Sequence, residues 1–158
     1  NDTCKDALNI SDFLSSLHIE VGDLNYIREA GFSEGVSAII VNELKDLEAT
    51  KRPLQCWDSK NNIIYIKDKD QWTSDNSKKT KLRETIGAVV TKCTQNFSTW
   101  EDNNPSCLEI GTKENDEYCE MVKNTLGSAE EGKREKEINR IIKMVTAEVH
   151  VDKKKVLQ

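Results

Sequence analysis

The sequence lacks any run of about 18 apolar residues, which is roughly the length that a membrane-spanning helix needs. We therefore expect no membrane span. The first residues also lack the basic, apolar and small-residue order of a secretory signal peptide. Because the chain does not begin with Met, we expect a fragment or a processed product with other domains upstream.

The sequence motifs of the common enzyme classes are also missing. There is no G-x-S-x-G, no H-E-x-x-H and no glycine-rich loop followed by Lys, the patterns that carry nucleophilic, zinc-dependent and nucleotide chemistry. His18 and His150 lie near opposite ends of the chain. Acidic pairs such as Glu114 and Asp116 are typical of a solvated surface, whereas a catalytic pair has to converge across a cleft. We therefore predict no enzyme and no cofactor.

Paired cysteines are absent as well. The five cysteines are widely spaced and include no C-x-x-C: Cys4, Cys56, Cys93, Cys107 and Cys119. This spacing argues against both a disulfide framework and a zinc site, so we predict buried thiols, no metal and a reducing compartment. Asn-x-Ser/Thr triplets at Asn1, Asn9 and Asn96 argue for secretion, but Asn96 lies in a helical pattern and is interpreted as a chance match.

The sequence has 158 residues, a length that predicts one domain or one domain with a small appendage. Its charged residues are unevenly distributed along the chain. The first 50 residues carry 3 basic and 10 acidic side chains, residues 51–100 carry 10 and 5, and residues 101–158 carry 10 and 13. The basic middle segment is either a phosphate-contacting surface or an ordinary solvated face.

Hydrophobic periodicity predicts mostly helices. Ser11 is expected to cap a short helix and Ser33 a firmer one, and a longer helix is expected to run without a break through 82–100. Two further helices are expected, one over 114–126 that ends before Gly127 and one that contains 138–149. Their apolar stripes are formed by the following residues: Val36, Ile39, Ile40, Leu44 and Leu47; Leu82, Ile86, Val89, Val90, Cys93, Phe97 and Trp100; Tyr118, Met121, Val122 and Leu126; Ile138, Ile141, Ile142, Val145 and Val149.

Between these helices, 54–57 and 63–67 are short runs of β-branched and aromatic residues on either side of the turn-forming DSKNN. This pattern predicts a β-hairpin. The fold class is therefore α+β and mostly α, with four or five helices packed around one β-hairpin. We expect residues 1–32 to form an N-terminal helical edge or linker and residues 33–158 to form the hairpin-plus-helices domain.

Basic residues gather on and beside the predicted hairpin, interleaved with Trp57, Tyr65 and Trp72. They are Lys60, Lys67, Lys69, Lys78, Lys79, Lys81 and Arg83. Aromatic side chains with basic neighbours suit base stacking and phosphate contact, although the same aromatics could pack the hairpin onto the helices. A second hypothesis is homo-oligomerisation through the apolar stripes at 82–100 and 138–149, with burial inside one chain as the alternative.

Several segments together resemble a known family. RPLQCWDSKNNIIYIKDKDQWTSD, KKTKLRETIGAVV, STWEDNNP and INRIIKMVTAEVHVDK resemble, over roughly residues 33–155, a domain found near the C-terminus of many proteins of nucleocytoplasmic large DNA viruses, the giant viruses. The residues that carry the resemblance are Pro53, Cys56, Asp58, Tyr65, Asp68, Trp72, Trp100, Asn104, Pro105, Ile141, Ile142, Lys143 and Asp152.

The resemblance implies an upstream module of the C2H2 zinc-finger type or another DNA-binding type, and no known activity of the domain itself. We therefore expect a non-enzymatic viral accessory or interaction module that mediates protein assembly beside a nucleic-acid-binding module. Its partner would be a second copy or another viral protein, in the host cytoplasm (the viral factory) or the virion. The alternative is direct binding of nucleic acid by the basic hairpin–helix region.

Overall fold

The structure, a computed structural model, describes residues 4–58 and 60–150. The α-helices are α1 (Ile10–Ser16), α2 (Val21–Ala30), α3 (Phe32–Lys45), α4 (Thr80–Gln95), α5 (Phe97–Asn103), α6 (Lys113–Leu126) and α7 (Glu131–Val149). The strands are β1 (Leu54–Asp58), β2 (Ile63–Asp68) and β3 (Gln71–Ser74), and short 3-10 helices are η2 (Ala49–Lys51) and η3 (Pro105–Leu108). The prediction of a mostly α, α+β fold is confirmed, with more helices than expected.

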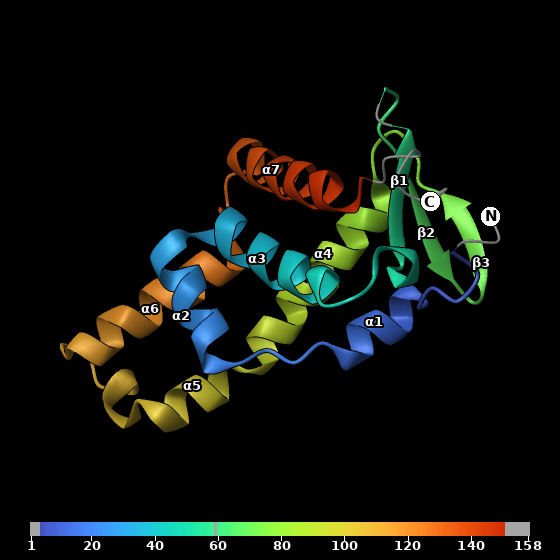
Figure 1. Ribbon diagram of the computed structural model, residues 1–158. Coiled ribbons are helices and arrows are strands. Elements are labelled where there is room, and N and C mark those ends of the chain that lie inside the picture. The colour runs from blue at the N-terminus through green and yellow to red at the C-terminus, as the bar shows by residue number, and fades with distance from the viewer. Residues whose placement is uncertain (1–3, 59, 151–158) are drawn as a thin grey trace.

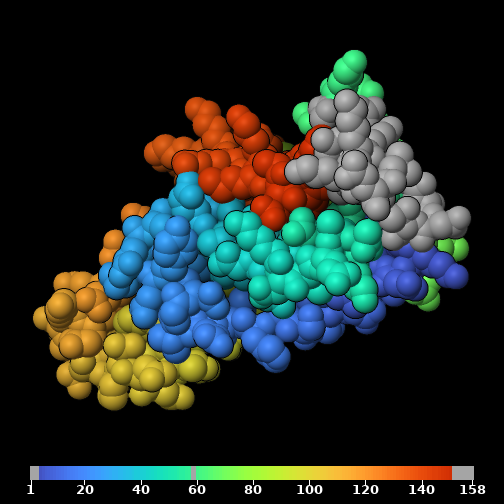
Figure 2. Space-filling view, in the orientation of Figure 1, coloured from blue at the N-terminus to red at the C-terminus, as the bar shows by residue number. Residues whose placement is uncertain are grey.

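The sheet lies at one end of the molecule and α5, η3 and α6 lie at the other (Figure 1). Helix α4 runs between the two ends, and α7 lies along α3 (Figures 1 and 2). One hydrophobic core joins all these layers, and it includes Phe13 of α1 and Ile27 of α2. The N-terminal segment predicted as an edge or linker therefore packs into the same core as the helices that follow it.

The sheet has three antiparallel strands in the order β1-β2-β3, where the sequence predicted a two-stranded hairpin. The connection between β2 and β3, which the sequence pattern did not predict, is the tight turn Lys69-Asp70. Both of its residues have positive φ, 49° and 61°. Such turns favour Asn or Gly. Here Asn9 supplies the support, because its side-chain oxygen accepts from the Asp70 backbone N–H at 2.9 Å and its amide donates to the Asp70 carboxylate at 3.1 Å.

The single helix predicted over 82–100 is wrong, because α4 ends at Gln95 and α5 begins at Phe97. The junction residue Asn96 has φ −102° and ψ 5°, and its side-chain amide donates to the Lys92 carbonyl at 2.8 Å. A side chain that takes a carbonyl of the preceding turn competes with continuation of the helical ladder. Trp100 nevertheless stays on the buried side, since α5 continues toward the core.

Two predicted helix caps are also wrong. Helix α1 begins at Ile10 with Asn9 before it, and α3 begins at Phe32 after Gly31, so Ser11 and Ser33 both lie inside the first turn. The Ser33 hydroxyl instead donates to the Glu137 carbonyl of α7 at 3.0 Å. In both cases the sequence offered a residue that is typical of caps, but the helix starts two residues earlier, at the apolar Ile10 and Phe32.

The lysines at the start of α4 are balanced by Asp75, which is 8% exposed. The Asp75 carboxylate accepts from the backbone N–H groups of Asn76, Lys81 and Leu82 at 2.9, 3.1 and 3.0 Å. A carboxylate on the free N–H groups of a first helical turn satisfies them and opposes the positive end of the helix dipole. This buried acid explains why cations are tolerated at that position.

The apolar stripes of α4 and α7 are buried inside the chain. Leu82, Ile86, Val89 and Cys93 of α4 are 2% exposed or less, as are Ile141, Val145 and Val149 of α7. These seven residues therefore belong to the intrachain core, while Val90, Phe97, Ile138 and Ile142 of the same stripes are partly buried and pack against it. On α6 the predicted inward set holds for Met121, whereas Leu126 is exposed.

Candidate interaction surfaces

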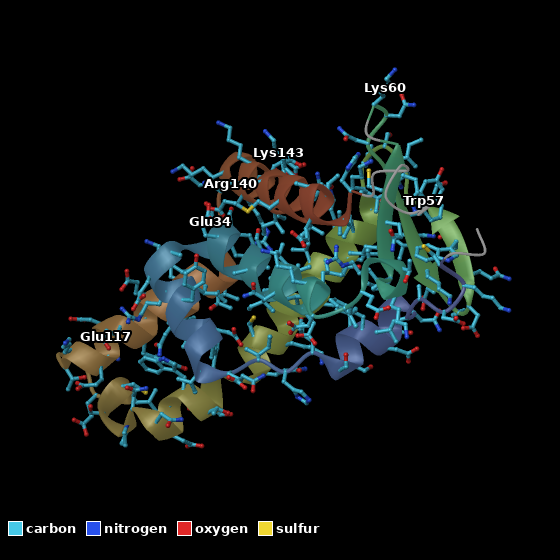
Figure 3. All side chains as sticks on the ribbon, in the orientation of Figure 1. Glu34, Trp57, Lys60, Glu117, Arg140 and Lys143 are labelled. Atoms are coloured by element: carbon cyan, nitrogen blue, oxygen red, sulfur yellow. The ribbon has the colours of Figure 1, made fainter. Side chains whose placement is uncertain are left out.

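Four of the predicted basic residues lie on the β1–β2 hairpin tip or at the start of α4. Lys60 is at the hairpin tip (Figure 3). The Lys79 ammonium donates to the Asn62 carbonyl in the same hairpin, and the Lys81 ammonium donates to the Thr73 hydroxyl at 2.6 Å. Lys78 is exposed next to Lys79. These residues are called the basic end below.

Lys67 does not belong to this surface, because its side chain is buried and only 6% of the residue is exposed. The ammonium donates to the backbone carbonyls of Lys5 and Ala7 at 2.8 and 2.7 Å. A buried cation needs such acceptors. The prediction that Lys67 contacts nucleic acid is therefore corrected. The hydrogen bonds of this lysine link the N-terminal segment to β2.

Replacing Lys67 by Met is expected to destabilise the fold by about 2 kcal/mol, because two carbonyls in a largely buried position lose their donor. Urea unfolding followed by circular dichroism measures the change. Lys69→Met is the matched control, since Lys69 is exposed, and its effect should stay within about 0.5 kcal/mol. Equal effects of the two substitutions would contradict the anchoring role of Lys67.

Lys69 is also separated from the basic end, whereas Arg83 lies beside it, with its Nε donating to the Lys78 carbonyl at 2.8 Å. Lys69 lies in the β2–β3 turn, at the opposite end of β2, which spans about 17 Å. The Arg83 guanidinium forms a two-pronged ion pair with Glu135 at 2.8 and 3.2 Å and donates to Asn139 at 2.7 Å. It thus links α4 to α7, and Glu135 neutralises its charge.

The aromatic residues of the predicted site cluster on the outer face of the sheet. Trp57 stacks on Tyr65 with ring centroids 4.5 Å apart, and Trp72 lies 5.6 Å from Trp57. All three are half-buried, whereas Cys56 and Ile64 on the inner face are fully buried. The sequence pattern therefore predicted correctly that these aromatic residues lie close together. Their rings stack on one another, and they also remain partly exposed to solvent.

The opposite end of the molecule carries a surface that sequence patterns did not single out. Residues 101–120 contain seven acidic side chains and one basic side chain, a net charge of −6. Since the whole chain carries −5, all other residues together carry +1. This segment, called the acidic tip below, forms the end of α5, η3 and the start of α6 (Figures 1 and 2). Glu117 marks it in Figure 3.

Two apolar side chains stand out from the acidic tip into solvent. Leu108 is 64% exposed and Ile110 is 96% exposed, with Glu109 between them. Most apolar residues of this size are buried in folded domains. Two exposed apolar side chains on one short loop, with charged residues around them, make this loop a candidate for a protein–protein contact.

Hydrogen bonds hold the loop that carries this pair. The Thr112 hydroxyl is within bonding distance of the Ser106 and Glu109 carbonyls, at 3.0 and 2.8 Å, and accepts from the Asn115 backbone N–H at 3.0 Å. The Asn115 amide donates to the carbonyl of the buried Cys107 at 2.7 Å. A loop that is already ordered loses little conformational entropy when it binds.

Buried aromatic residues support the tip from below. Trp100 is 1% exposed, lies 5.4 Å from the Tyr118 ring, and donates from its indole nitrogen to Asn25 of α2 at 2.9 Å. Burial, followed by the hydrogen bond to the Glu101 carboxylate, raises the pKa of Tyr118 to about 12. The Tyr118 hydroxyl thus keeps its proton at neutral pH and donates it to Glu101.

The sequence contained the signal for this surface, but averaging hid it. The acidic excess of 101–120 is diluted by the +3 of residues 121–158 when the last third is summed as −3. A sliding window of twenty residues would have isolated it. The exposure of Leu108 and Ile110 had no such signal, because neither lies in a periodic pattern.

Thiols, metal ligands and membrane spans add no further site. The five cysteines form no disulfide with one another, and burial raises the pKa of Cys93 to about 12. Cys56 and Cys93 are buried, as predicted, while Cys119 is exposed. Over residues 4–58 and 60–150, no cluster of three or more His, Cys, Asp or Glu is placed to hold a metal ion, and no helix has the length and apolarity to cross a membrane.

Comparison with protein families, with curated proteins and with solved structures found no match to the chain. The resemblance to the giant-virus domain therefore stays a prediction. The two ends of the molecule, the basic end and the acidic tip, are the features from which a function can be inferred.

Proposed function

We propose that the domain is a non-enzymatic interaction module that binds another protein through the acidic tip. The observation that carries the proposal is the exposed pair Leu108 and Ile110 on an ordered loop. The surrounding net charge of −6 would select a basic partner surface with an apolar recess. The resemblance to giant-virus proteins supports a role in viral protein assembly, in the viral factory or the virion, beside a nucleic-acid-binding module.

A photoreactive residue at position 110 tests this proposal. The full chain would carry p-benzoylphenylalanine in place of Ile110 in the cells that naturally make the protein, and ultraviolet light should yield a discrete cross-linked adduct. The additional substitution Leu108→Asp should remove the adduct, because it puts a charge into the apolar contact. The adduct is read by its mass.

The matched control carries the same photoreactive residue at Lys45, which is exposed at the end of α3 and far from the tip in sequence. The proposal fails if position 110 gives no adduct. It fails equally if positions 45 and 110 give the same set of adducts, since random collision would then explain both.

Nucleic-acid binding by the basic end is the second candidate function. It is favoured by one observation, the half-buried Trp57–Tyr65–Trp72 cluster in the same sheet whose hairpin tip carries Lys60. Half-exposed aromatic rings can stack on bases, and lysines nearby can contact phosphates. The burial of Lys67 and the pairing of Arg83 with Glu135 reduce the charge available for this function.

Changing Lys78, Lys79 and Lys81 together to Glu should abolish retention of single-stranded DNA or RNA and leave the helical circular dichroism signal intact. Removing one lysine–phosphate interaction lowers the dependence of log affinity on log salt by roughly 0.7 to 0.9. The control changes three exposed lysines elsewhere, Lys51, Lys113 and Lys133, to Glu, which alters the net charge equally. Equal loss in both variants, or no retention by the natural sequence at low salt, would exclude this second function.

A further inference from the structure

We propose that the partner of the acidic tip is a second copy of this chain, which receives Leu108 and Ile110 in a groove on the outer face of α7. This inference rests on the proposed function and names the occupant of the same surface. The groove is a shallow, open depression whose lining residues all belong to α7: Asn139, Arg140, Lys143, Met144 and Ala147. It is called the α7 groove below.

The α7 groove has the chemistry that the tip requires. Met144 and Ala147 give it an apolar floor, and methionine adapts its shape to an incoming side chain. Its rim is basic. Lys143 makes no ion pair among the described residues, and Arg140 forms an ion pair with Glu34 of α3. Lys136 is exposed one turn earlier. The nearby Glu135 and Glu148 are paired with Arg83 and Arg52, so three basic side chains and the acidic Glu34 remain, a net charge of +2.

The tip and the groove are complementary in both charge and polarity. The tip offers apolar Leu108 and Ile110 on either side of Glu109, within a segment of net charge −6. The groove offers an apolar floor between Arg140 and Lys143. Opposite charges around an apolar contact accelerate the encounter and fix its register. A partner of any other kind would have to reproduce features that this chain already carries.

One chain cannot fill its own groove with its own tip. Helix α7 lies along one side of the helical layer, and the loop between α5 and α6 lies on the other (Figure 1). Figure 3 shows the same separation between Arg140 and Lys143 on α7 and Glu117 on α6. The contact is therefore heterologous, with two different surfaces, and it builds rings or open chains of copies.

Sedimentation velocity over a concentration series tests the inference on the purified full chain. The natural sequence should show a weight-average mass that rises with concentration. The substitution Ile110→Asp puts a charge into the apolar contact of the acidic tip. The double substitution Lys143→Glu with Ala147→Glu puts acidic side chains into the α7 groove. Each variant alone should remain a monomer at every concentration. Leu126→Asp is the control, because Leu126 is another exposed apolar residue, at 46%, outside both surfaces. It should associate like the natural sequence.

The decisive measurement is made on a mixture of the tip variant (Ile110→Asp) and the groove variant (Lys143→Glu with Ala147→Glu). The groove variant keeps an intact tip and the tip variant keeps an intact groove, so an equimolar mixture should form a dimer and stop there. A mixture that stays monomeric overturns the proposed pairing, as does a natural sequence that stays monomeric at the highest concentration. If the chain is monomeric while position 110 cross-links to a different protein in cells, the self-association fails and the proposed function stands. Circular dichroism confirms that each variant is folded.

Discussion

Gly35→Ala is expected to destabilise the fold by about 3 kcal/mol, the upper part of the usual range for an overpacked core. Helices α2 and α3 are joined by a single residue, Gly31, and fold back on each other, so that Gly35 of α3 touches Ile27 of α2. A methyl group on Gly35 would lie 2.4 Å from Ile27 Cγ1 and 2.6 Å from Ile27 Cα. The second atom is backbone, so no rotamer change relieves the contact, and the two helices must separate.

Gly87→Ala is the matched control for this effect. Gly87 is exposed in the middle of α4, and a methyl group there meets nothing within 4 Å. Since Ala is the better helix former by about 1 kcal/mol, this substitution should stabilise the protein. Urea unfolding should therefore move the midpoint in opposite directions for the two variants. Equal stability of Gly35→Ala and the natural sequence would mean that α2 and α3 are less closely packed than these distances require.

Arg52→Met should cost about 3 kcal/mol, because the guanidinium binds the C-terminal ends of two helices that are far apart in sequence. Its Nε donates to the Leu44 carbonyl of α3 at 2.8 Å, and Nη1 donates to the Glu148 carbonyl of α7 at 3.1 Å. Nη2 forms an ion pair with the Glu148 carboxylate at 3.5 Å, and the side chain is 15% exposed. A cation at helix C-termini also opposes their negative dipole ends. Loss of these charge-assisted bonds removes the guanidinium donor of the Glu148 carbonyl, and it leaves the Leu44 carbonyl with the Leu47 backbone N–H alone, at 3.1 Å.

Two further variants separate charge from geometry. Arg52→Lys keeps the charge but has one compact ammonium, which cannot span both helix ends, so it should recover only part of the loss. Lys51→Met removes an exposed neighbouring cation and should change the free energy of unfolding by less than about 0.5 kcal/mol. Chemical denaturation measures all three. Full recovery by Arg52→Lys would show that charge alone, without the fork of donors, links α3 to α7.

Local chemistry made some elements of the fold predictable. The end of α6 at Leu126 followed from Gly127, whose φ of 75° suits glycine. The strand runs 54–57 and 63–67 and the buried stripe of α4 followed from side-chain type and periodicity. These features depend on residues within a few positions of each other, so a single sequence contains the necessary information.

Other features depended on residues that are distant in the sequence. Strand β3 was missed because its turn, Lys69-Asp70, lacks glycine and is supported by Asn9, about sixty positions earlier. Lys67 looked like a surface base because its two carbonyl acceptors come from Lys5 and Ala7. The close packing at Gly35 has no signal in the sequence, since only the position of Ile27 shows why no larger residue fits.

The candidate site was predicted in part for the same reason. The sequence pattern predicted that Trp57, Tyr65 and Trp72 lie close together and that the start of α4, with Lys79, lies beside the hairpin, because strand pairing and helix start are local. It could not show that Arg83 faces Glu135, which lies on a helix formed fifty residues later.

The separation of charge between the two ends also gives the molecule a permanent electric dipole. Its negative pole is the segment 101–120, and the remainder of the chain is almost neutral. Near a positively charged surface the molecule would rotate and approach with Leu108 and Ile110 foremost, before any atom is in contact. This orientation acts over roughly 10 Å at 0.1 M salt and shortens as salt is added. Ionic strength would thus set how often a collision is productive and leave the apolar contact itself unchanged.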